Sequence, residues 1–507
     1  GPSLLSPNKI VGNVYFEPWI KDINTKCCSN IVFIPGLEAS RLYSDKGIIG
    51  NNTLWEPNRN ADVSKLYLDN AGKSNNNVLV GDIMAKAYGV KDIYGTFAKY
   101  LDSLKQSDTI NDWFGYSYDW RKSLDQVIDT KENRLDSSIG DLVSSIMNIA
   151  STSKTGKVSL IAHSNGGLVM KYVYKILKDR GLENIIDKAI GVAVPYLGTP
   201  SAISGLLHGD GQRIAGGLFL SQLNARNLGI NMPSAYSLLP STAYFVKAFG
   251  PTIAFASSTV EGLNNAKYEK EINNSNSQNN FILDTANNRK VNNKDIEVPI
   301  KGNDRLLRAA EIIHSVLDPF PWSKIINYWA IVGWNKYTTT GIKYDNKDCK
   351  DCSGLTYEKE RTKLGDGTVV ANSAEHDSSN NAYIDLANDS KKEGRDIDHA
   401  NIMGATSTIN YIDRIIKNNN DNEKIKEQLN KIDGVQVTTY SKLPVDNSYF
   451  IISTHSPVDL HIYDQDGKHV GINNLAKEIG IEPGLIISAD EDVIGSSIEF
   501  KERNDGS

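Results

Sequence analysis

Four short apolar runs recur along the chain, and each is continuous rather than alternating with polar residues. They are IVFIP (31–35), VSLIA (158–162), AIGVAV (189–194) and YWAIVGW (328–334). Strands buried on both faces of a parallel sheet have this pattern, because neither face meets water. Helix-like spacing over 135–150 and 165–179 lies between the runs. The alternation predicts an α/β fold with a doubly wound core sheet.

Residues 201–326 break this pattern. The segment begins with glycine-rich amphipathic pieces, continues through an Asn-rich polar stretch (271–295) and includes an apolar helical piece, LLRAAEIIHSVL (306–317). Because it lies between two predicted core strands, we predict that it is an inserted cap or lid. The alternative is a surface excursion, which suits the Asn-rich part best.

From residue 433 the chain changes to short alternating strands separated by turn residues. DQDGK (464–468) is a hairpin signal, because Asp-Gly tolerates positive φ. We therefore predict a small C-terminal β-sandwich-like domain over 433–507. The α/β core is then expected to comprise residues 1–200 and 327–432.

Composition excludes several classes of protein. The 507 residues are 40% hydrophobic and 23% charged, as in ordinary globular proteins, and the net charge of −6 gives no electrostatic reason to expect nucleic acid. No apolar stretch reaches 18 residues, so no transmembrane segment is expected. The opening GPSLLSPNKI lacks the features of a signal peptide, and Gly-Pro is typical of a protease scar. We expect a secreted or cell-surface protein whose leader has been removed.

The four cysteines allow three pairings. Cys349 and Cys352 can close a small loop, whereas Cys27 and Cys28 are neighbours, which rarely bridge to each other. Four thiolates can also hold structural zinc, but adjacent ligands are poor geometry for it. Disulfides are the favoured interpretation. The Asp-rich turns of 433–507 suggest calcium only weakly, and we predict no metal and no cofactor.

The candidate chemistry begins at Ser164, within LIAHSNGGLVMKYV (160–173). A nucleophile elbow holds a serine on a strained turn between a strand and a helix, and it needs small neighbours. Ala162, Gly166 and Gly167 meet this need, although Ala162 replaces the first glycine of G-x-S-x-G. The following helix points its N-terminal amides toward the serine. The alternative is a tight structural turn.

A serine nucleophile needs a base and an acid, expected in the order Ser, Asp or Glu, His. His399, in the polar loop DIDHANIM near the end of the core, is the predicted base, and His376 is more typical of an exposed loop. Asp366 lies between two glycines in LGDGT and is the predicted acid, the alternative being an ordinary Asp-Gly turn. Asp398 competes, but adjacent residues seldom make the required contact.

Two backbone N–H groups are expected to form an oxyanion hole. One belongs to Asn165, directly after the serine. The other is expected in IVFIPGLEASRLY (31–43), where Leu37 is our first choice and Glu38 the second. The alternative for this stretch is a plain Pro-Gly turn that ends a strand.

Seven stretches in this order resemble the lecithin:cholesterol acyltransferase-like branch of the α/β-hydrolases, which also contains lysosomal phospholipases and bacterial lipase-like members. They span about 30 to 405 and are VFIPGLEASRL (32–42), YSYDWR (116–121), AHSNGGLV (162–169), VPYLGTP (194–200), MPSAYSLLPS (232–241), GDGTV (365–369) and DHANIM (398–403).

The resemblance implies an α/β-hydrolase fold with Ser164 as nucleophile, Asp366 as acid and His399 as base. It also implies that Leu37 and Asn165 line the oxyanion hole and that a lid lies in 200–326. No cofactor is implied.

The chain departs from the family pattern at three positions. Ala162 replaces the usual glycine, Asn165 replaces the commoner methionine, and Val370 stands where proline is frequent. The Asn-rich insertion and residues 433–507 fall outside the resemblance.

We therefore predict a serine carboxylester hydrolase, of lipase or esterase type, that acts on lipid or other apolar esters and touches lipid or polymer surfaces transiently. One alternative is a lipid acyltransferase of the same family. The other is a catalytically inactive surface-binding protein whose binding part is the C-terminal domain.

Overall fold

The structure is a computed structural model of the chain. It describes residues 27–45, 52–129, 133–211, 219–248, 250–256, 268–285, 295–321, 326–346, 355–375, 380–418, 422–429 and 431, together with six short strands between 435 and 501.

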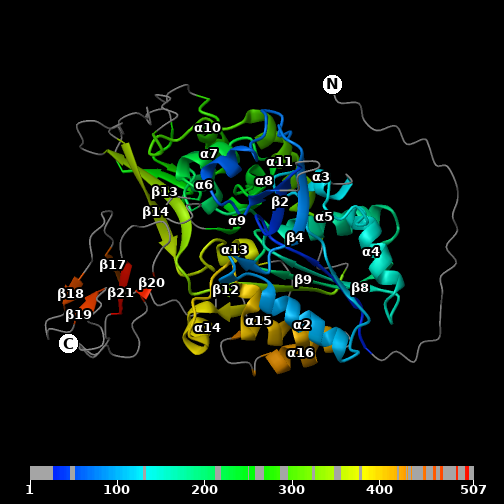
Figure 1. The fold of residues 1–507 in the computed structure, drawn as a ribbon. Coiled ribbons are helices and arrows are strands. Elements are labelled where there is room, and N and C mark those ends of the chain that lie inside the picture. The colour runs from blue at the N-terminus through cyan, green and yellow to red at the C-terminus, as the bar shows by residue number, and fades with distance from the viewer. Residues whose placement is uncertain are drawn as a thin grey trace.

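A seven-stranded sheet lies at the centre of the fold (Figure 1). Its order is β16-β15-β12-β9-β8-β1-β7, and all neighbours are parallel except β15 and β16. The strands are β1 (Asn30–Ile34), β7 (Trp113–Gly115), β8 (Val158–His163), β9 (Ile186–Val192), β12 (Tyr328–Trp334), β15 (Asn381–Asp385) and β16 (Val435–Gln436). The four apolar runs fall on β1, β8, β9 and β12, which confirms the predicted α/β core with a mostly parallel sheet.

Both faces of this sheet are buried, which explains why its strands do not alternate with polar residues. In β1, Val32 and Ile34 pack on one face while Ile31 and Phe33 pack on the other, because successive side chains of a strand point to opposite sides. Helices α4 (Leu142–Ser151) and α5 (Asn165–Asp179) cover the first face, and α2 (Gly95–Gln106) and α15 (Thr406–Lys417) cover the second.

The predicted helix over 165–179 is α5, with the same bounds. The helix predicted over 135–150 begins only at Leu142, because Asp141 caps it: the Asp141 carboxylate accepts a hydrogen bond from the Ser144 backbone N–H at 2.9 Å. The remaining elements of the core are α3 (Leu124–Asp129), η2 (Glu183–Ile185), α13 (Ala371–Ala374), α14 (Leu386–Glu393), η5 (Ile402–Gly404) and α16 (Asn422–Leu429).

A second layer of helices and strands covers the upper side of the core in the view of Figure 1. Its sheet has the order β11-β10-β13-β14, so strands from 201–326 combine with two strands that follow β12. A separate apolar cluster fills this layer, including Phe255, Phe281 and Tyr344. The elements are α6 (Ser201–His208), α7 (Gln222–Gly229), α8 (Pro233–Ser237), α9 (Thr242–Lys247), β10 (Ile253–Phe255), β11 (Glu271–Ile272), α10 (Ser275–Ile282), α11 (Asp304–Leu317), β13 (Thr338–Asn346) and β14 (Leu355–Thr362).

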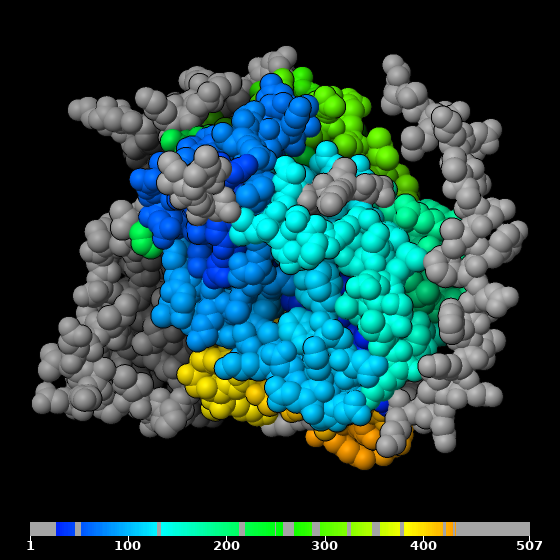
Figure 2. All heavy atoms as spheres, turned by 45° about the vertical axis from the view of Figure 1, so that its right-hand side comes forward, coloured from blue at the N-terminus to red at the C-terminus, as the bar shows by residue number. Residues whose placement is uncertain are grey.

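The segment between β1 and α2 forms small excursions on the surface. Figure 2 shows that the early part of the chain, coloured blue to cyan, covers much of the face in view, with yellow and orange segments at its lower edge. The elements of this segment are β2 (Ser40–Ser44), β3 (Asn52–Trp55), α1 (Asn60–Ser64), β4 (Val78–Ile83), β5 (Lys86–Ala87) and β6 (Lys91–Asp92).

The described strands after residue 440 are β17 (Tyr449–Ile452), β18 (His461–Tyr463), β19 (His469–Gly471), β20 (Ile487–Ser488) and β21 (Ser497–Lys501). They form an antiparallel sheet of order β17-β21-β20 and the pair β18-β19, which flanks the predicted hairpin turn. The sandwich predicted for 433–507 depends on residues outside the described part. Among the described residues, no helix is long and apolar enough to cross a membrane.

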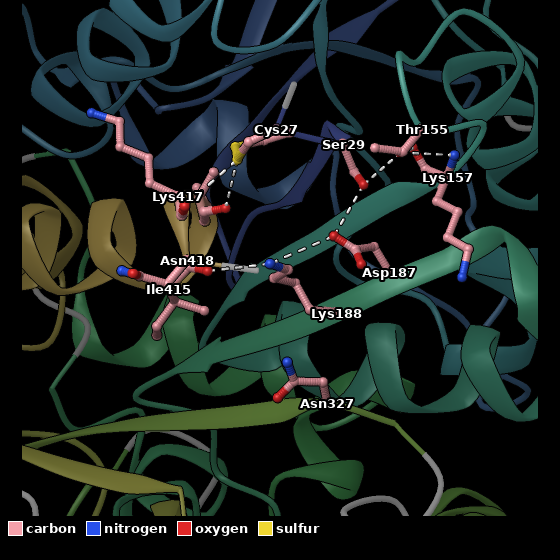
Figure 3. Close-up of polar contacts among 12 residues, drawn as sticks. Cys27, Ser29, Thr155, Lys157, Asp187, Lys188, Asn327, Ile415, Lys417 and Asn418 are labelled. Carbon is pink, nitrogen blue, oxygen red and sulfur yellow. Dashed lines mark hydrogen bonds and ion pairs between the residues drawn. A yellow bond between two sulfur atoms is a disulfide. The ribbon is translucent and has the colours of Figure 1, made fainter. Parts of the chain in front are cut away.

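Cys27 and Cys28 form a disulfide, so the expectation that neighbouring cysteines do not bridge is wrong for this pair. The pair lies just before β1, where Cys28 is buried and the Cys27 sulfur lies 3.5 Å from the carbonyl oxygen of Ile416. Figure 3 shows the adjoining polar contacts, in which Lys188 lies between Asp187 and the end of α15. These contacts are at the amino ends of the parallel strands. Residues 349 and 352 lie outside the described part.

Candidate active site

Ser164 occupies a sharp turn between β8 and α5, at the carboxyl end of the sheet. Its φ of 52° and ψ of −131° are rare for a residue with a side chain. The two glycines that follow give this turn its clearance. A Cβ atom on Gly166 would lie 2.4 Å from the carbonyl oxygen of Ile34, and one on Gly167 would lie 2.2 Å from the side chain of Val194. Ser164 therefore lies on a strained turn between a strand and a helix, with no room for larger residues at the two positions after it.

The three residues predicted for the catalytic chemistry lie together, although they come from distant parts of the chain. The Nε2 atom of His399 is 2.8 Å from the Oγ atom of Ser164, and its Nδ1 atom is 2.8 Å from the Oδ2 atom of Asp366. A carboxylate only accepts hydrogen bonds, so Nδ1 carries a proton, and in the neutral ring Nε2 is then the acceptor that faces the serine hydroxyl. This is the arrangement that lets histidine take a proton from serine.

The Asp366 carboxylate is fixed by its own loop. Its Oδ1 atom accepts hydrogen bonds from the backbone N–H groups of Thr368, at 2.9 Å, and Val369, at 2.8 Å. Gly367 has a φ of 103°, which a residue with a side chain rarely adopts, and its N–H donates to the hydroxyl of Thr338. The predicted tight turn thus directs one carboxylate oxygen to the loop amides and the other to His399.

The pKa of His399 is raised above its ordinary value. Burial acts to lower it, but the charge and hydrogen bond of Asp366 raise it, and the charge of Asp398 adds to them. Asp398 itself is turned elsewhere, since its carboxylate lies 3.3 Å from the Nζ atom of Lys91 and accepts a hydrogen bond from the N–H of Ala400. Its contacts agree with the choice of Asp366 over Asp398 as partner of the histidine ring.

The loop after β1 lies against the serine. A Cβ atom on Gly36 would lie 3.0 Å from the Cβ of Ser164. Within the described part of the chain, the backbone N–H groups of Leu37 and Asn165 donate no hydrogen bond. The second choice, Glu38, has a φ of 61°, and its carbonyl oxygen accepts a 2.6 Å hydrogen bond from the Trp55 ring N–H. Burial raises the pKa of the Glu38 carboxyl to about 7.

His163, the residue before Ser164, also contacts the site. Its Nε2 atom lies 2.9 Å from the carbonyl oxygen of His399, and its Nδ1 atom lies 2.8 Å from the hydroxyl of Tyr94. Burial, together with the nearby His399, lowers the pKa of His163 well below its ordinary value, so its ring is neutral. Sequence patterns could not reveal this contact, because Tyr94 is 69 residues away along the chain.

His208 and His314 have other partners. His208 contacts the carbonyl oxygen of Ile296 and the hydroxyl of Tyr344, and His314 contacts Asp318 and the carbonyl oxygen of Ser237. Residue 376 lies outside the described part. No group of three or more His, Cys, Asp or Glu side chains suited to a metal ion occurs among the described residues.

The stretch that leads from β9 into α6 is joined to the loop that carries Asp366. The hydroxyls of Thr199 and Ser201 both donate to the carbonyl oxygen of Thr368, two residues after Asp366. Ser373 donates to the carbonyl oxygen of Gly198. The stretch VPYLGTP therefore holds the loop that orients the carboxylate, a role that its sequence did not suggest.

Comparison with known proteins gives one family model, described as lecithin:cholesterol acyltransferase, which matches residues 82–406. This range includes Ser164, Asp366 and His399 but not Leu37.

Two curated proteins of Arabidopsis thaliana are similar. The chain is 24% identical over 271 residues to "Lecithin-cholesterol acyltransferase-like 4", which covers 52% of the chain and 48% of that protein. It is 29% identical over 129 residues to "Phospholipase A(1) LCAT3", which covers 25% of the chain and 27% of that protein. The matches thus span about half or less of these relatives. A solved structure, "The crystal structure of Tle4-Tli4 complex", overlaps loosely, with a TM-score of 0.38 at 12% identity over 68% of the chain and 88% of that chain.

Proposed function

Because the chain belongs to the lecithin:cholesterol acyltransferase family, we propose that it is a serine carboxylester hydrolase with an α/β-hydrolase fold, acting on lipid or other apolar esters. One observation carries the proposal: Ser164, His399 and Asp366 are joined in line by two contacts of 2.8 Å. A serine hydroxyl, a neutral imidazole and a buried carboxylate in this order are the parts that acyl transfer through serine requires.

The first step forms an acyl-enzyme. The Oγ atom of Ser164 bonds to the ester carbonyl carbon while its proton moves to Nε2 of His399, and Asp366 stabilises the imidazolium that results. The carbonyl oxygen becomes an oxyanion, which in this scheme accepts hydrogen bonds from the N–H groups of Leu37 and Asn165. Losing one such donor typically costs roughly 2.7–4 kcal/mol of transition-state stabilisation.

The intermediate then collapses and is resolved. His399 gives its proton to the oxygen of the leaving alcohol, the ester bond breaks, and the acyl group stays on Ser164. His399 takes a proton from water as the water oxygen bonds to the acyl carbon, and it returns that proton to the Oγ atom of Ser164 as the bond between the acyl carbon and Oγ breaks and the free acid leaves. Every proton in this scheme is carried by His399, so the mechanism requires neither metal nor cofactor.

We propose that the layer over the core is a cap, formed by 201–326 together with β13 and β14. The hydrogen bond from the Thr199 hydroxyl to the Thr368 carbonyl oxygen supports this proposal. It attaches the start of the segment to the loop that carries Asp366, and so places the cap next to the site. We also propose that residues 433–507 form an accessory domain that contacts lipid or polymer surfaces. The protein itself is proposed to lie outside the cell or at its surface.

Acyl transfer is the second candidate function, because the family name and the relative named acyltransferase-like both point to it. The relative named phospholipase A(1) favours hydrolysis of phospholipid. In a transferase, an alcohol replaces water in the last step. The residues of the site perform the same chemistry in both cases.

Product analysis separates the two candidates. Phospholipid vesicles are incubated with the protein, with and without a long-chain alcohol, and free fatty acid, lysophospholipid and alkyl ester are quantified by mass spectrometry. Free acid in both incubations, without alkyl ester, supports hydrolysis and rejects transfer. Alkyl ester that increases with alcohol while free acid falls supports transfer. An absence of every product, on phospholipid and on short-chain esters alike, contradicts the proposed activity.

A further inference from the structure

Two buried tyrosine hydroxyls join the loop after β1 to the two residues that flank Ser164. Tyr118 connects the Pro35 carbonyl oxygen, at 3.0 Å, with the side-chain nitrogen of Asn165, at 3.1 Å. Tyr94 connects the Gly36 N–H, at 2.9 Å, with Nδ1 of His163, at 2.8 Å. We propose that Tyr94 and Tyr118 are positioning residues that set the separation of the two oxyanion donors. This inference rests on the proposed function.

The direction of the hydrogen bonds through Tyr118 follows from its partners. The Pro35 carbonyl oxygen can only accept, so the single hydroxyl proton of Tyr118 is directed to it. The atom of Asn165 that faces the tyrosine must then be a donor, which fixes the orientation of that amide. Tyr118 therefore links the peptide that precedes Gly36 to Asn165, whose own backbone N–H is one of the proposed oxyanion donors.

The direction through Tyr94 follows in the same way. The Nε2 atom of His163 faces a carbonyl oxygen, that of His399, so Nε2 carries the proton of this neutral ring. Nδ1 is then an acceptor and receives the hydroxyl proton of Tyr94, whose oxygen in turn accepts from Gly36 N–H. A single chain of hydrogen bonds thus runs from the Gly36 loop to the backbone of the catalytic histidine.

Burial makes these bridges rigid. The exposed fractions are 2% for Tyr94, 1% for Tyr118, 3% for His163 and 1% for Asn165, so water has little access to replace a lost partner. The Tyr94 ring packs edge-on against Phe33 at 4.9 Å, which holds it from the strand side. A buried group that loses its partner costs about 1–3 kcal/mol.

Leu37 directly follows Pro35 and Gly36. The Pro35 carbonyl oxygen accepts a hydrogen bond from Tyr118, and the Gly36 N–H donates one to Tyr94. The position of the Leu37 N–H relative to the Asn165 N–H is therefore set by Tyr118 on one side and by Tyr94 on the other. An oxyanion donor acts mainly in the transition state, so its displacement lowers kcat and leaves KM nearly unchanged.

The test removes each hydroxyl in the whole 507-residue chain and measures kcat and KM on a water-soluble p-nitrophenyl ester. Tyr94→Phe and Tyr118→Phe are expected to lower kcat about 10- to 100-fold with little change in KM, since small displacements of catalytic groups cost up to about 10² in rate. The affinity of a trifluoromethyl ketone, which forms an oxyanion on the serine, is expected to weaken by the same factor as kcat/KM. Tyr411→Phe is the matched control, because Tyr411 is fully buried and its hydroxyl has no hydrogen-bond partner among the described residues.

Two results would overturn the inference: kcat values of both variants equal to that of Tyr411→Phe, or a rise in KM with unchanged kcat. If a tyrosine variant does not fold, Asn165→Ala removes the Tyr118 partner while keeping the backbone donor. It is expected to lower kcat and ketone affinity together, and unchanged values would likewise reject the inference. A wild-type protein without esterase activity contradicts the proposed function itself, whereas an active wild type with fully active variants rejects only the positioning role.

Discussion

At the scale of single residues, two neighbouring carboxylates are assigned different roles. Asp366 contacts the ring of His399, whereas Asp398 contacts Lys91. We expect Asp366→Asn to lower kcat by roughly 10⁴, because an amide at this position favours the wrong tautomer of the histidine. Asp398→Asn is the matched control and is expected to retain most of the wild-type kcat. Ester hydrolysis at saturating substrate measures both, and equal losses would reject the assignment.

The raised pKa of His399 predicts how activity depends on pH. The histidine must be neutral to accept the serine proton, so the acid limb of kcat/KM should have an apparent pKa above the ordinary value of 6.5. Asp398→Asn should move this limb to lower pH, because the charge of Asp398 helps to raise the pKa. A limb below 6.5 in the wild type, or an upward move in the variant, would contradict this view.

The raised pKa of His399 also makes the free energy of unfolding depend on pH. Activity should rise with pH, whereas the contribution of His399 to stability should fall. A histidine with a raised pKa in the folded state binds its proton more tightly there than in the unfolded chain. Its stabilising contribution is therefore complete below pH 6.5 and is lost as pH rises through the folded pKa. Urea unfolding across this range should show less stabilisation by His399 at high pH, measured as the difference between the wild type and His399→Gln. A difference that grows with pH would contradict this prediction.

At the scale of elements, the elbow depends on close approach between α5 and the strand β1. Gly166→Ala places a methyl group where the Ile34 carbonyl oxygen lies 2.4 Å away, so we expect a loss of about 1–3 kcal/mol or more of stability. Gly229→Ala is the control, because no atom lies within 4 Å of its added Cβ and the residue is helical. It should be neutral or stabilising by about 0.4–1 kcal/mol. Thermal unfolding compares them, and similar melting temperatures would refute the clearance argument.

The sequence was most informative where local pattern and topology act together. Continuous apolar runs placed β1, β8, β9 and β12, and the chain order of Ser164, Asp366 and His399 corresponds to three residues that the fold brings into contact. The helix predicted from residue 135 begins only at Leu142. The Asp141 side chain caps the first turn of α4 and so fixes its start, although apolar residues with helical spacing come before it. The pairing of β10 with β13 was missed because it joins residues about 90 positions apart, which no local pattern reports. The contacts of Tyr94 were missed for the same reason, whereas Tyr118 lies in YSYDWR, one of the stretches on which the resemblance rests.

At the scale of the whole molecule, the contacts given above for the site lie between Phe33 and Ala400, while β17 to β21 form sheets of their own. We expect a chain ending at residue 440, which keeps β16 on the core sheet, to retain wild-type kcat/KM on a water-soluble ester. If 433–507 serves as a surface-binding domain, the same chain should lose activity on lipid vesicles. Loss of activity on the soluble ester, with an intact fold by circular dichroism, would contradict this division.

The proposed chemistry depends on Ser164 as a nucleophile that His399 activates. Intact-mass spectrometry after treatment with a fluorophosphonate tests it most directly, because this reagent bonds to activated serines. We expect one adduct in the wild type, located on Ser164 by peptide mapping and missing in Ser164→Ala. A wild type without an adduct, or an adduct that persists in Ser164→Ala, would contradict the claim and favour a protein that binds surfaces without catalysis.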